Sequence, residues 1–430
     1  MNTTELFTEL NNSSLEVRLS AVRELGRRIK SKEITMAKET SQTNNHIHTM
    51  FSFCPHYPTT AAALSKKAGL QTCGSADHDS YAAAPEMKEA GRQIGIGTTV
   101  AVELRVDFSE FGFGDRKINN PDSLGIAYVI AHGIPVIHAD RVNKWLKPIN
   151  LARNLRNQRM VGDLNSMLAG FGIKPLDFER DVWAASEARN GGSITERHIL
   201  YALSKRILDE NQPEKVVDYL TDKLRLRSIS PKLQKYVTDP TNPHRVYDLL
   251  GVLKSEFLPG FYIQPNTAEC IPGSEFLRFT RSVDGIPTYA ILGNIAESPT
   301  GDKKAEKFED EYIDTLVPTL VDAGFLGLAY MLTRNTREQA LRYKALAQKY
   351  SRPEINGVDI NSSRQTFECK ELEQPGFEHL ADSAWMLVGH EYEVCNGRAG
   401  VSFEKGISLA TRDKQIKHYA DIGRRSVHEA

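Results

Sequence analysis

The hydrophobic positions near the start of the chain recur at the spacing of an α-helix. Between residues 15 and 29 they fall on one face, and arginine and lysine occupy the opposite face. This face consists of Leu15, Leu19, Val22, Leu25 and Ile29. We therefore predict a helical extension over residues 1–42 that packs on the main body of the protein. Binding of a partner by the same face is the alternative.

From about residue 43 the pattern changes to short apolar runs that alternate with helical periods. GLQTCGSADHDS and TTVAVELRVDF indicate strands, and EMKEAGRQIG between them indicates a helix. The alternation returns at about residue 261, with strands expected in GIPTYAILGNI, FLGLAYML and EINGVDIN. Such alternation is typical of an α/β fold with mainly parallel strands.

Residues 141–260 differ from the flanking regions. They are charged, rich in leucine and arginine, and helical in period throughout. We therefore predict four parts: the helical extension (1–42), a first α/β part (43–140), a helical insertion (141–260), and a second α/β part with a C-terminal segment (261–430). His198 lies in a helical pattern, where a packed or surface role is expected.

Two places have the spacing of a capping box, in which two side chains three residues apart satisfy the first turn of a helix. Ser13 and Glu16 precede the apolar face of the extension. Thr336 and Gln339 precede the helix expected in NTREQALRYKALAQKY. A further long helix is expected over SPTGDKKAEKFEDEYIDTLVPTLVDAG.

Composition narrows the class of protein. The 430 residues carry a net charge of −1, and 40% of them are hydrophobic, as in soluble globular proteins. No overall positive field attracts nucleic acid, and no apolar run approaches the roughly 20 residues that cross a bilayer. The first residues lack the order of a secretion signal. Without such an apolar run we expect no membrane as a partner. Five cysteines without a CxxC pair indicate a reduced, cytoplasmic protein.

The segment NNHIHTMFSF contains the first candidate chemistry. His46 and His48 are separated by one residue, and side chains at positions i and i+2 of a strand point to the same side. At a strand end these two imidazoles would converge on one point, as metal ligands do. A pair of surface histidines in a loop is the alternative.

Further polar side chains follow the other expected strands, where parallel α/β folds gather their functional groups. These residues are Cys54, His56, Asp77, His78, Asp79, Glu103, His132, His138, Asp359 and Asn361. Imidazole and carboxylate together are typical ligands of Zn, Mn or Fe. A carboxylate such as Glu103 can bridge two ions, and paired ions suit phosphoester hydrolysis. As alternatives, His132 would cap a helix C-terminus and His138 would be a buried structural histidine.

The order of these motifs resembles a known family. HIHTMFS, GSADHD, VAVELRV, IAHG and GVDIN are similar to the successive metal motifs of the PHP family, the polymerase and histidinol phosphatase domains. The resemblance covers roughly residues 43–140 and 260–400. It implies a distorted (β/α)7 TIM-like barrel built from the two α/β parts. It also implies two or three divalent ions at the carboxyl ends of the strands, and hydrolysis of phosphoesters.

The resemblance implies roles for the matching residues. His46 and His48 would ligate one ion, and His78 would ligate another. Glu103 would bridge ions, and Asp359 falls on the aspartate of the last motif, where it would also bridge.

For some residues the resemblance leaves more than one role or more than one candidate. His132 would be a further metal ligand with His138 as its rival, and His138 would otherwise serve as the acid for the leaving group. Asp77 directly precedes a ligating histidine and would orient it by a hydrogen bond. The family has a third ligand shortly after the two histidines, and here either Cys54 or His56 would take that place.

Besides this uncertain third ligand, the chain departs from the family pattern in two places. The last motif usually ends in histidine, and here Asn361 stands there, whose amide oxygen binds transition metals more weakly. Leu292 to Asn294 stand where the family often has a histidine. At least one metal position would then be weak, empty or supplied by another residue such as Glu269 or Glu297.

Phosphate recognition requires cations or free backbone N–H groups. Arg334 follows an expected strand, Arg364 lies just past the last metal motif, and Arg105 shares a strand face with Glu103. Each of these arginines would otherwise be a solvated surface charge, which is the preferred interpretation for Lys303 and Lys304.

The sequence therefore predicts a metal-dependent phosphoesterase that acts on a phosphorylated small molecule, with a phosphomonoester as the favoured substrate. A nuclease or nucleotide phosphatase of the same chemistry is one alternative; nucleic acid is less favoured because it would need a basic groove. Arginines of the helical insertion that could line such a groove are Arg153, Arg156, Arg159, Arg197 and Arg206. A non-catalytic metal-binding protein is the other alternative.

Overall fold

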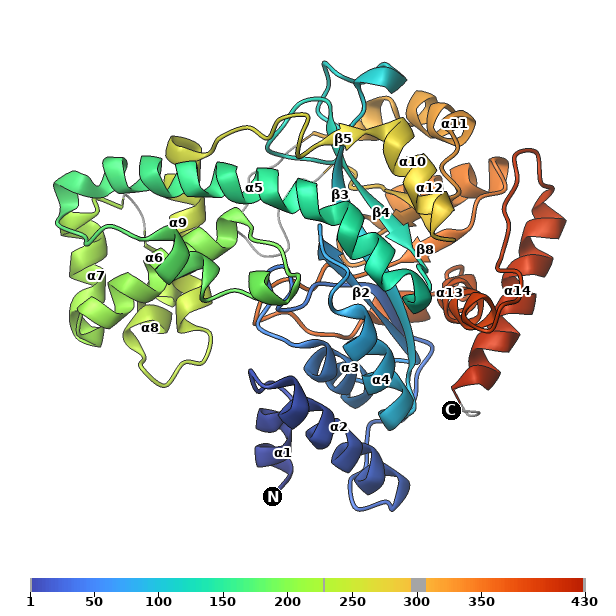
Figure 1. The fold of residues 1–430 in the computed structure, drawn as a ribbon, viewed down its shortest axis with the longest axis horizontal. Helices are drawn as coiled ribbons and strands as arrows, with labels where there is room; N and C mark the ends of the chain where they lie inside the picture. Colours follow the sequence, from blue (N-terminus) through green and yellow to red (C-terminus); the bar gives the residue numbers. More distant parts are fainter. Residues whose placement is uncertain (1, 227–228, 295–306, 428–430) are drawn as a thin grey trace.

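The computed structural model describes residues 2–226, 229–294 and 307–427 and shows a barrel-shaped sheet surrounded by helices (Figure 1). Within these residues the sheet has the strand order β1-β2-β3-β4-β6-β7-β8, and β5 pairs with β3. The strands are β1 (Thr43–Ile47), β2 (Thr72–His78), β3 (Gly97–Asp107), β4 (Ile126–His132), β5 (Ile271–Pro272), β6 (Ile286–Ala290), β7 (Gly327–Tyr330) and β8 (Glu354–Asn356). The predicted fold class, an α/β distorted TIM-like barrel, is confirmed.

The sheet is mainly parallel and nearly closed. Only β4 runs antiparallel to its neighbours β3 and β6. A parallel bridge between Ile47 and Ile360 brings the chain after β8 alongside β1. There the N–H of His48 donates to the Ile360 carbonyl at 2.9 Å, and the N–H of Ile360 donates to the His46 carbonyl at 3.2 Å. The contact that closes the barrel therefore fixes the backbone of two candidate ligands.

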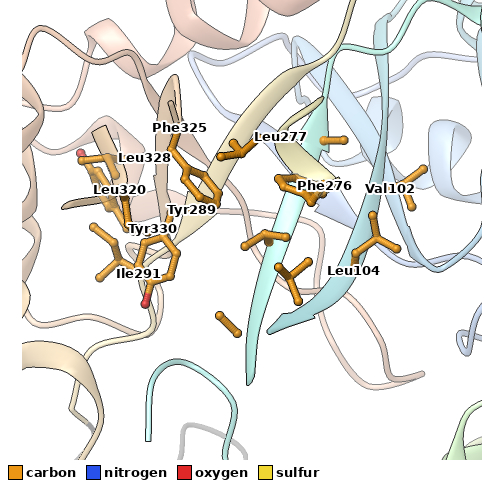
Figure 2. Close-up of a cluster of buried hydrophobic side chains, with 14 of the residues drawn as sticks. Val102, Leu104, Phe276, Leu277, Tyr289, Ile291, Leu320, Phe325, Leu328 and Tyr330 are labelled. Atoms are coloured by element: carbon orange, nitrogen blue, oxygen red, sulfur yellow. The ribbon is translucent and has the colours of Figure 1, made fainter. Parts of the chain in front are cut away.

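Helices cover the outside of the sheet. They are α3 (Pro58–Lys67), α4 (Ala84–Ile94), α10 (Gly273–Ser282), α11 (Ile313–Ala323), α12 (Arg337–Lys349), α13 (His379–Cys395) and α14 (Leu409–Ser426). Figure 2 shows the main core, in which Val102 and Leu104 of β3 lie near Phe276 of α10. Because side chains alternate along a strand, Glu103 between them faces the barrel interior. No helix of the described residues is both long and apolar enough for a bilayer crossing.

Residues 139–261 form a helical region on one side of the barrel (green to yellow in Figure 1). Its helices are α5 (Ala139–Leu168), α6 (Glu196–Glu210), α7 (Val216–Asp218), α8 (Pro231–Thr238) and α9 (Arg245–Phe261). Its apolar side chains, among them Leu164, Leu203 and Leu253, pack into a cluster of their own. The region thus has its own core, while the first part of α5 contributes Val142, Leu146 and Ile149 to the barrel core.

The N-terminal extension consists of α1 (Thr3–Glu9) and α2 (Leu15–Lys30). Val22 and Leu25 pack with Ala62 of α3 and Met87 of α4, so the apolar face of the extension covers the barrel helices. Leu15 is the exception and remains 49% exposed at the start of α2.

The capping-box predictions had different outcomes. Thr336 and Gln339 form the box at the start of α12. At α2 the prediction was wrong, because Ser14 rather than Ser13 precedes the helix and makes no side-chain cap bond. The long helix expected from residue 298 is observed only from Ile313, and residues 295–306, with Glu297, Lys303 and Lys304, lie outside the described residues.

Candidate metal centre

Three histidines and two carboxylates converge at the carboxyl ends of the barrel strands. Within the described residues, two groups have ligand atoms that all lie within 4.8 Å of one another. One group is His46, His48 and Asp359, and the other is His48, His78 and Glu103. Sequence spacing alone pairs His46 with His48; the fold adds the other three.

The distances between ligand atoms show how the two groups join. Nε2 of His46 lies 3.4 Å from Oε1 of Glu103, and Nδ1 of His78 lies 2.8 Å from Oε2 of the same carboxylate. Nε2 of His48 lies 3.3 Å from Oδ1 of Asp359. Glu103 therefore presents one oxygen to each side of the cluster.

Close packing brings His46 into this position. Gly357 follows β8, and a Cβ atom added to it would lie 2.4 Å from the Cβ of His46. A glycine is therefore required here so that the strand that carries His46 can approach the chain leading to Asp359.

The members of the cluster shift one another's pKa values. Burial by itself disfavours protonation of His46, but the charge of Glu103 and a hydrogen bond to it outweigh burial and raise the pKa of His46 to about 9. Burial by itself would raise the pKa of Glu103, yet His46 and His78 hold that pKa well below its usual range. Burial and the nearby His48 lower the pKa of His78. The protein atoms thus form a tightly coupled set of bases and carboxylates.

Asp77 supports a different histidine from the one predicted. Its Oδ1 accepts hydrogen bonds from the Thr49 N–H and the Ser52 hydroxyl, both at 2.6 Å. Oγ of Ser52 lies 3.3 Å from Nδ1 of His48. The expectation that Asp77 orients His78 is wrong, because adjacent residues of a strand point to opposite faces.

Within the described residues, His132 lines the same pocket but lies outside both ligand groups. It is 1% exposed, and neither of its ring nitrogens has a hydrogen-bond partner. Burial lowers its pKa to about 3, so the ring is neutral and both nitrogens remain unsatisfied. Such a group is suited to a water or an ion.

Several predicted site residues lie elsewhere. His56 packs against the Phe367 ring with centroids 5.7 Å apart, and Cys54 is buried in an apolar cluster. Neither belongs to a ligand group, and Asp359 is instead the third member beside His46 and His48.

Three of the residues predicted to act on substrate do not line the pocket. His138 is paired with Asp284 at 2.9 Å. Arg364 is paired with Asp248 at 2.6 Å and stacks on Tyr236. Arg105 is buried against Glu269, which also removes Glu269 as a substitute ligand. In each case a partner distant in the sequence engages the side chain.

Asn361, Leu292 and Arg334 line the pocket. The amide nitrogen of Asn361 donates to Oδ1 of Asp359 at 2.7 Å, so this side chain supports a ligand, and its own role as a metal ligand stays a prediction.

The helical region contributes five residues to the pocket, of which the sequence had named two, Arg153 and Arg197, for a basic groove. They are Arg153, Thr195, Glu196, Arg197 and Lys254. Nη1 of Arg197 donates to the Asn361 carbonyl at 3.1 Å. Phe53 and Tyr128 add aromatic walls. No local motif marks these residues, because only the docking of the helices brings them here.

Comparisons with known proteins find distant similarity to solved structures. No family model and no curated protein matches the chain. A solved structure of a candidate metal-dependent phosphoesterase from Bifidobacterium adolescentis is similar, with 18% identity and a TM-score of 0.49 over 78% of this chain and 96% of that chain. An amidohydrolase from Chromobacterium violaceum, solved with sulfate and without metal, has 14% identity and a TM-score of 0.47 over 75% and 89%. At these values neither likeness carries an argument about activity.

Proposed function

We propose that the protein is a metal-dependent phosphoesterase of the PHP type that hydrolyses a small-molecule phosphomonoester. The observation that carries this proposal is the convergence of three imidazoles and two carboxylates into two overlapping ligand groups. This donor set matches the preference of Zn, Mn or Fe for mixed nitrogen and oxygen ligands.

Two ions fit the residues present. Nδ1 of His48 faces Ser52, so His48 has only Nε2 to offer and serves one ion. Nε2 of His48 belongs to both ligand groups but lies closer to Asp359, at 3.3 Å, than to Glu103, at 3.7 Å, so we assign it to the ion of His46 and Asp359. His78 then shares the second position with Glu103, whose two oxygens face the two sides of the cluster. Such a carboxylate is placed to bridge.

Divalent ions held by these residues would supply charge stabilisation to the phosphoryl group and lower the pKa of the attacking water. The chain itself provides the means to bind the substrate. Arg334 and Arg197 line the pocket, and guanidinium groups match phosphate oxygens in geometry and charge. Phe53 and Tyr128 wall the site, which favours exclusion of bulk water.

The ion pairing of the nearby arginines favours a small molecule over nucleic acid as the substrate. Arg153 and Arg156, two of the arginines considered for a basic groove, are buried in ion pairs with Asp79 and Glu269. Arg206 is paired with Asp181 at 2.9 Å. The charges of these three guanidinium groups are compensated by carboxylates, so they do not make up the basic groove that a polynucleotide would need.

The proposed location is the cytoplasm. All five cysteines are free thiols in the structure, as expected in a reducing compartment.

The test combines metal analysis with turnover. The purified protein is analysed for bound metals and assayed for phosphate release from an aryl phosphate after addition of Mn²⁺ or Zn²⁺. The double variant His46→Ala/His48→Ala should lose metal and turnover while remaining folded. His138→Ala serves as the control, because His138 lies outside the pocket, and it should retain both. Metal without turnover in the wild type would favour the non-catalytic alternative, and turnover that survives in the double variant would overturn the site.

A further inference from the structure

We propose that the helical region completes the metal centre: Asn150, Arg153 and Ser193 hold the turn at His78–Asp79 and thereby position the His78 ring. This inference concerns the metal centre of the proposed function. It makes these three side chains positioning residues, since their polar atoms bond the His78 and Asp79 carbonyls and the Asp79 carboxylate.

The turn has an unusual backbone. Asp79 has a φ of 48°, in the left-handed region that side chains other than glycine rarely adopt. Its N–H donates to the carbonyl of Glu103 at 2.9 Å. The chain therefore bends sharply directly after His78, beside the strand that carries the bridging carboxylate. A conformation of this kind persists only where its surroundings enforce it.

The helical region supplies that enforcement through three contacts. The side-chain amide of Asn150 donates to the Asp79 carbonyl at 2.8 Å. Arg153, one turn further along α5, is ion-paired with the Asp79 carboxylate, and both side chains are only 3% exposed. The hydroxyl of Ser193 donates to the His78 carbonyl. The polar groups on both sides of the turn are thus held by residues outside the barrel.

We call the contacts of Asn150, Arg153 and Ser193 with the turn the clamp. Buried ion pairs hold the helix that carries Asn150 and Arg153. Glu269 pairs with Arg156 of α5 at 2.7 Å and also with Arg105, which follows Glu103 by two residues on β3. All of these side chains are at most 3% exposed. Buried ion pairs of this kind are costly to break because one partner is left uncompensated, so α5 is fixed against the barrel at the level of the metal centre.

The other ligands are held in a different way. The backbone of His46 and His48 is fixed by the bridge to Ile360, and the Asp77–Ser52 pair supports the ring of His48. Neither support involves α5. Loosening the clamp should therefore disturb the ion at His78 and leave the ion at His46, His48 and Asp359 in place.

The experiment uses the full-length protein and Co²⁺, whose visible absorption reports coordination geometry. Binding is followed by calorimetry and by the absorption spectrum for the wild type, Asn150→Ala and Asn165→Ala. Asn165 is the matched control, because it lies on the same helix and bonds the backbone of Leu176 within the helical region. A merely structural loss would affect both variants alike.

We expect Asn150→Ala to bind the second Co²⁺ about 10- to 100-fold more weakly, as for other partners that orient metal ligands, with a changed absorption band. Asn165→Ala should bind both ions with the wild-type spectrum. Wild-type affinity and spectrum in Asn150→Ala, or the same change in Asn165→Ala, would overturn the inference.

A second pair of variants covers a failure of Asn150→Ala to fold. Ser193→Ala removes the hydroxyl bonded to the His78 carbonyl, and Ser193→Thr retains a hydroxyl. Weaker Co²⁺ binding in Ser193→Ala than in the wild type, with affinity recovered in Ser193→Thr, supports the clamp. The same Co²⁺ affinity in the two variants overturns it. A wild type that binds two Co²⁺ ions but releases no phosphate would overturn the proposed activity and leave this inference standing. A wild type that binds no ion would overturn both.

Discussion

Glu103 and His78 are register partners on the adjacent parallel strands β3 and β2, and Oε2 of Glu103 lies 2.8 Å from Nδ1 of His78. The other carboxylate oxygen lies 3.4 Å from Nε2 of His46. Register therefore places a single carboxylate between histidines that are 32 residues apart in the chain, which is the arrangement that a bridging ligand needs.

Replacement of Glu103 tests that arrangement. Glu103→Gln keeps the size of the side chain but removes the negative charge shared by the two sides of the cluster. Since partners that merely orient a ligand cost about 10- to 100-fold in metal affinity or activity, loss of this ligand should cost at least about 100-fold in phosphate release. Kinetics and metal analysis of the variant measure the effect. Unchanged metal content and rate would show that Glu103 does not bridge.

Metal uptake should depend on pH because His46 competes with a proton. Its pKa in the folded, metal-free protein is raised to about 9, so at neutral pH the ring is protonated and an ion must displace that proton. Affinity should therefore rise with pH from about 7 and level off above about 9. Calorimetry in buffers of different ionisation enthalpy counts the released protons. A pH-independent affinity across this interval would contradict the prediction.

The same pKa has a consequence for stability without metal. The folded-state pKa of His46 lies above its ordinary value, so its contribution to stability is present below about pH 6.5 and is lost as pH rises through about 9. The midpoint of thermal unfolding of the metal-free protein should fall over this interval. In His46→Gln the fall should be smaller, and an identical pH profile would assign the effect to another group.

Ser52 should act on the metal centre through His48. The Ser52 hydroxyl donates to Asp77 at 2.6 Å, and its oxygen can then accept from Nδ1 of His48. This would leave Nε2 of His48 unprotonated for an ion. Ser52→Ala should weaken metal binding about 10- to 100-fold. Ser65→Ala is the control, because Ser65 is equally buried and its hydroxyl donates to the Ala61 carbonyl of α3, away from the metal centre.

The extension should be held by one buried ion pair. Arg18 of α2 pairs with Glu86 of α4 at 2.6 Å, with both side chains 4% exposed. Arg18→Ala leaves a buried carboxylate uncompensated and should reduce the free energy of unfolding by about 3–5 kcal/mol. Phosphate release at low temperature should be unchanged. Arg23→Ala removes a pair that is 4.0 Å long with an arginine 59% exposed, and it should leave stability nearly unchanged in chemical denaturation.

The sequence by itself determined the features that depend on local periodicity. Alternating strands and helices predicted an α/β fold with mainly parallel strands, and the resemblance of the metal motifs implied the barrel. The helical period predicted the apolar face of α2. The i, i+2 spacing of His46 and His48 predicted two imidazoles on one side of a strand, and Thr336 with Gln339 predicted a helix start. These features depend on neighbours within a few residues, whose geometry the backbone fixes.

The sequence motifs also named His78, Glu103 and Asp359 as candidate ligands, whereas only the tertiary structure decided which cations line the pocket. Arg105 and Arg364 were predicted to meet a substrate, but Glu269 and Asp248 engage them after more than 100 residues of intervening chain. Arg197 became a pocket residue because α6 docks beside Asp359. A charged side chain takes the partner that packing places nearest, and burial strengthens that pair as water is excluded. Which carboxylate reaches which cation is therefore set by the arrangement of distant elements, and the sequence pattern around each residue does not contain it.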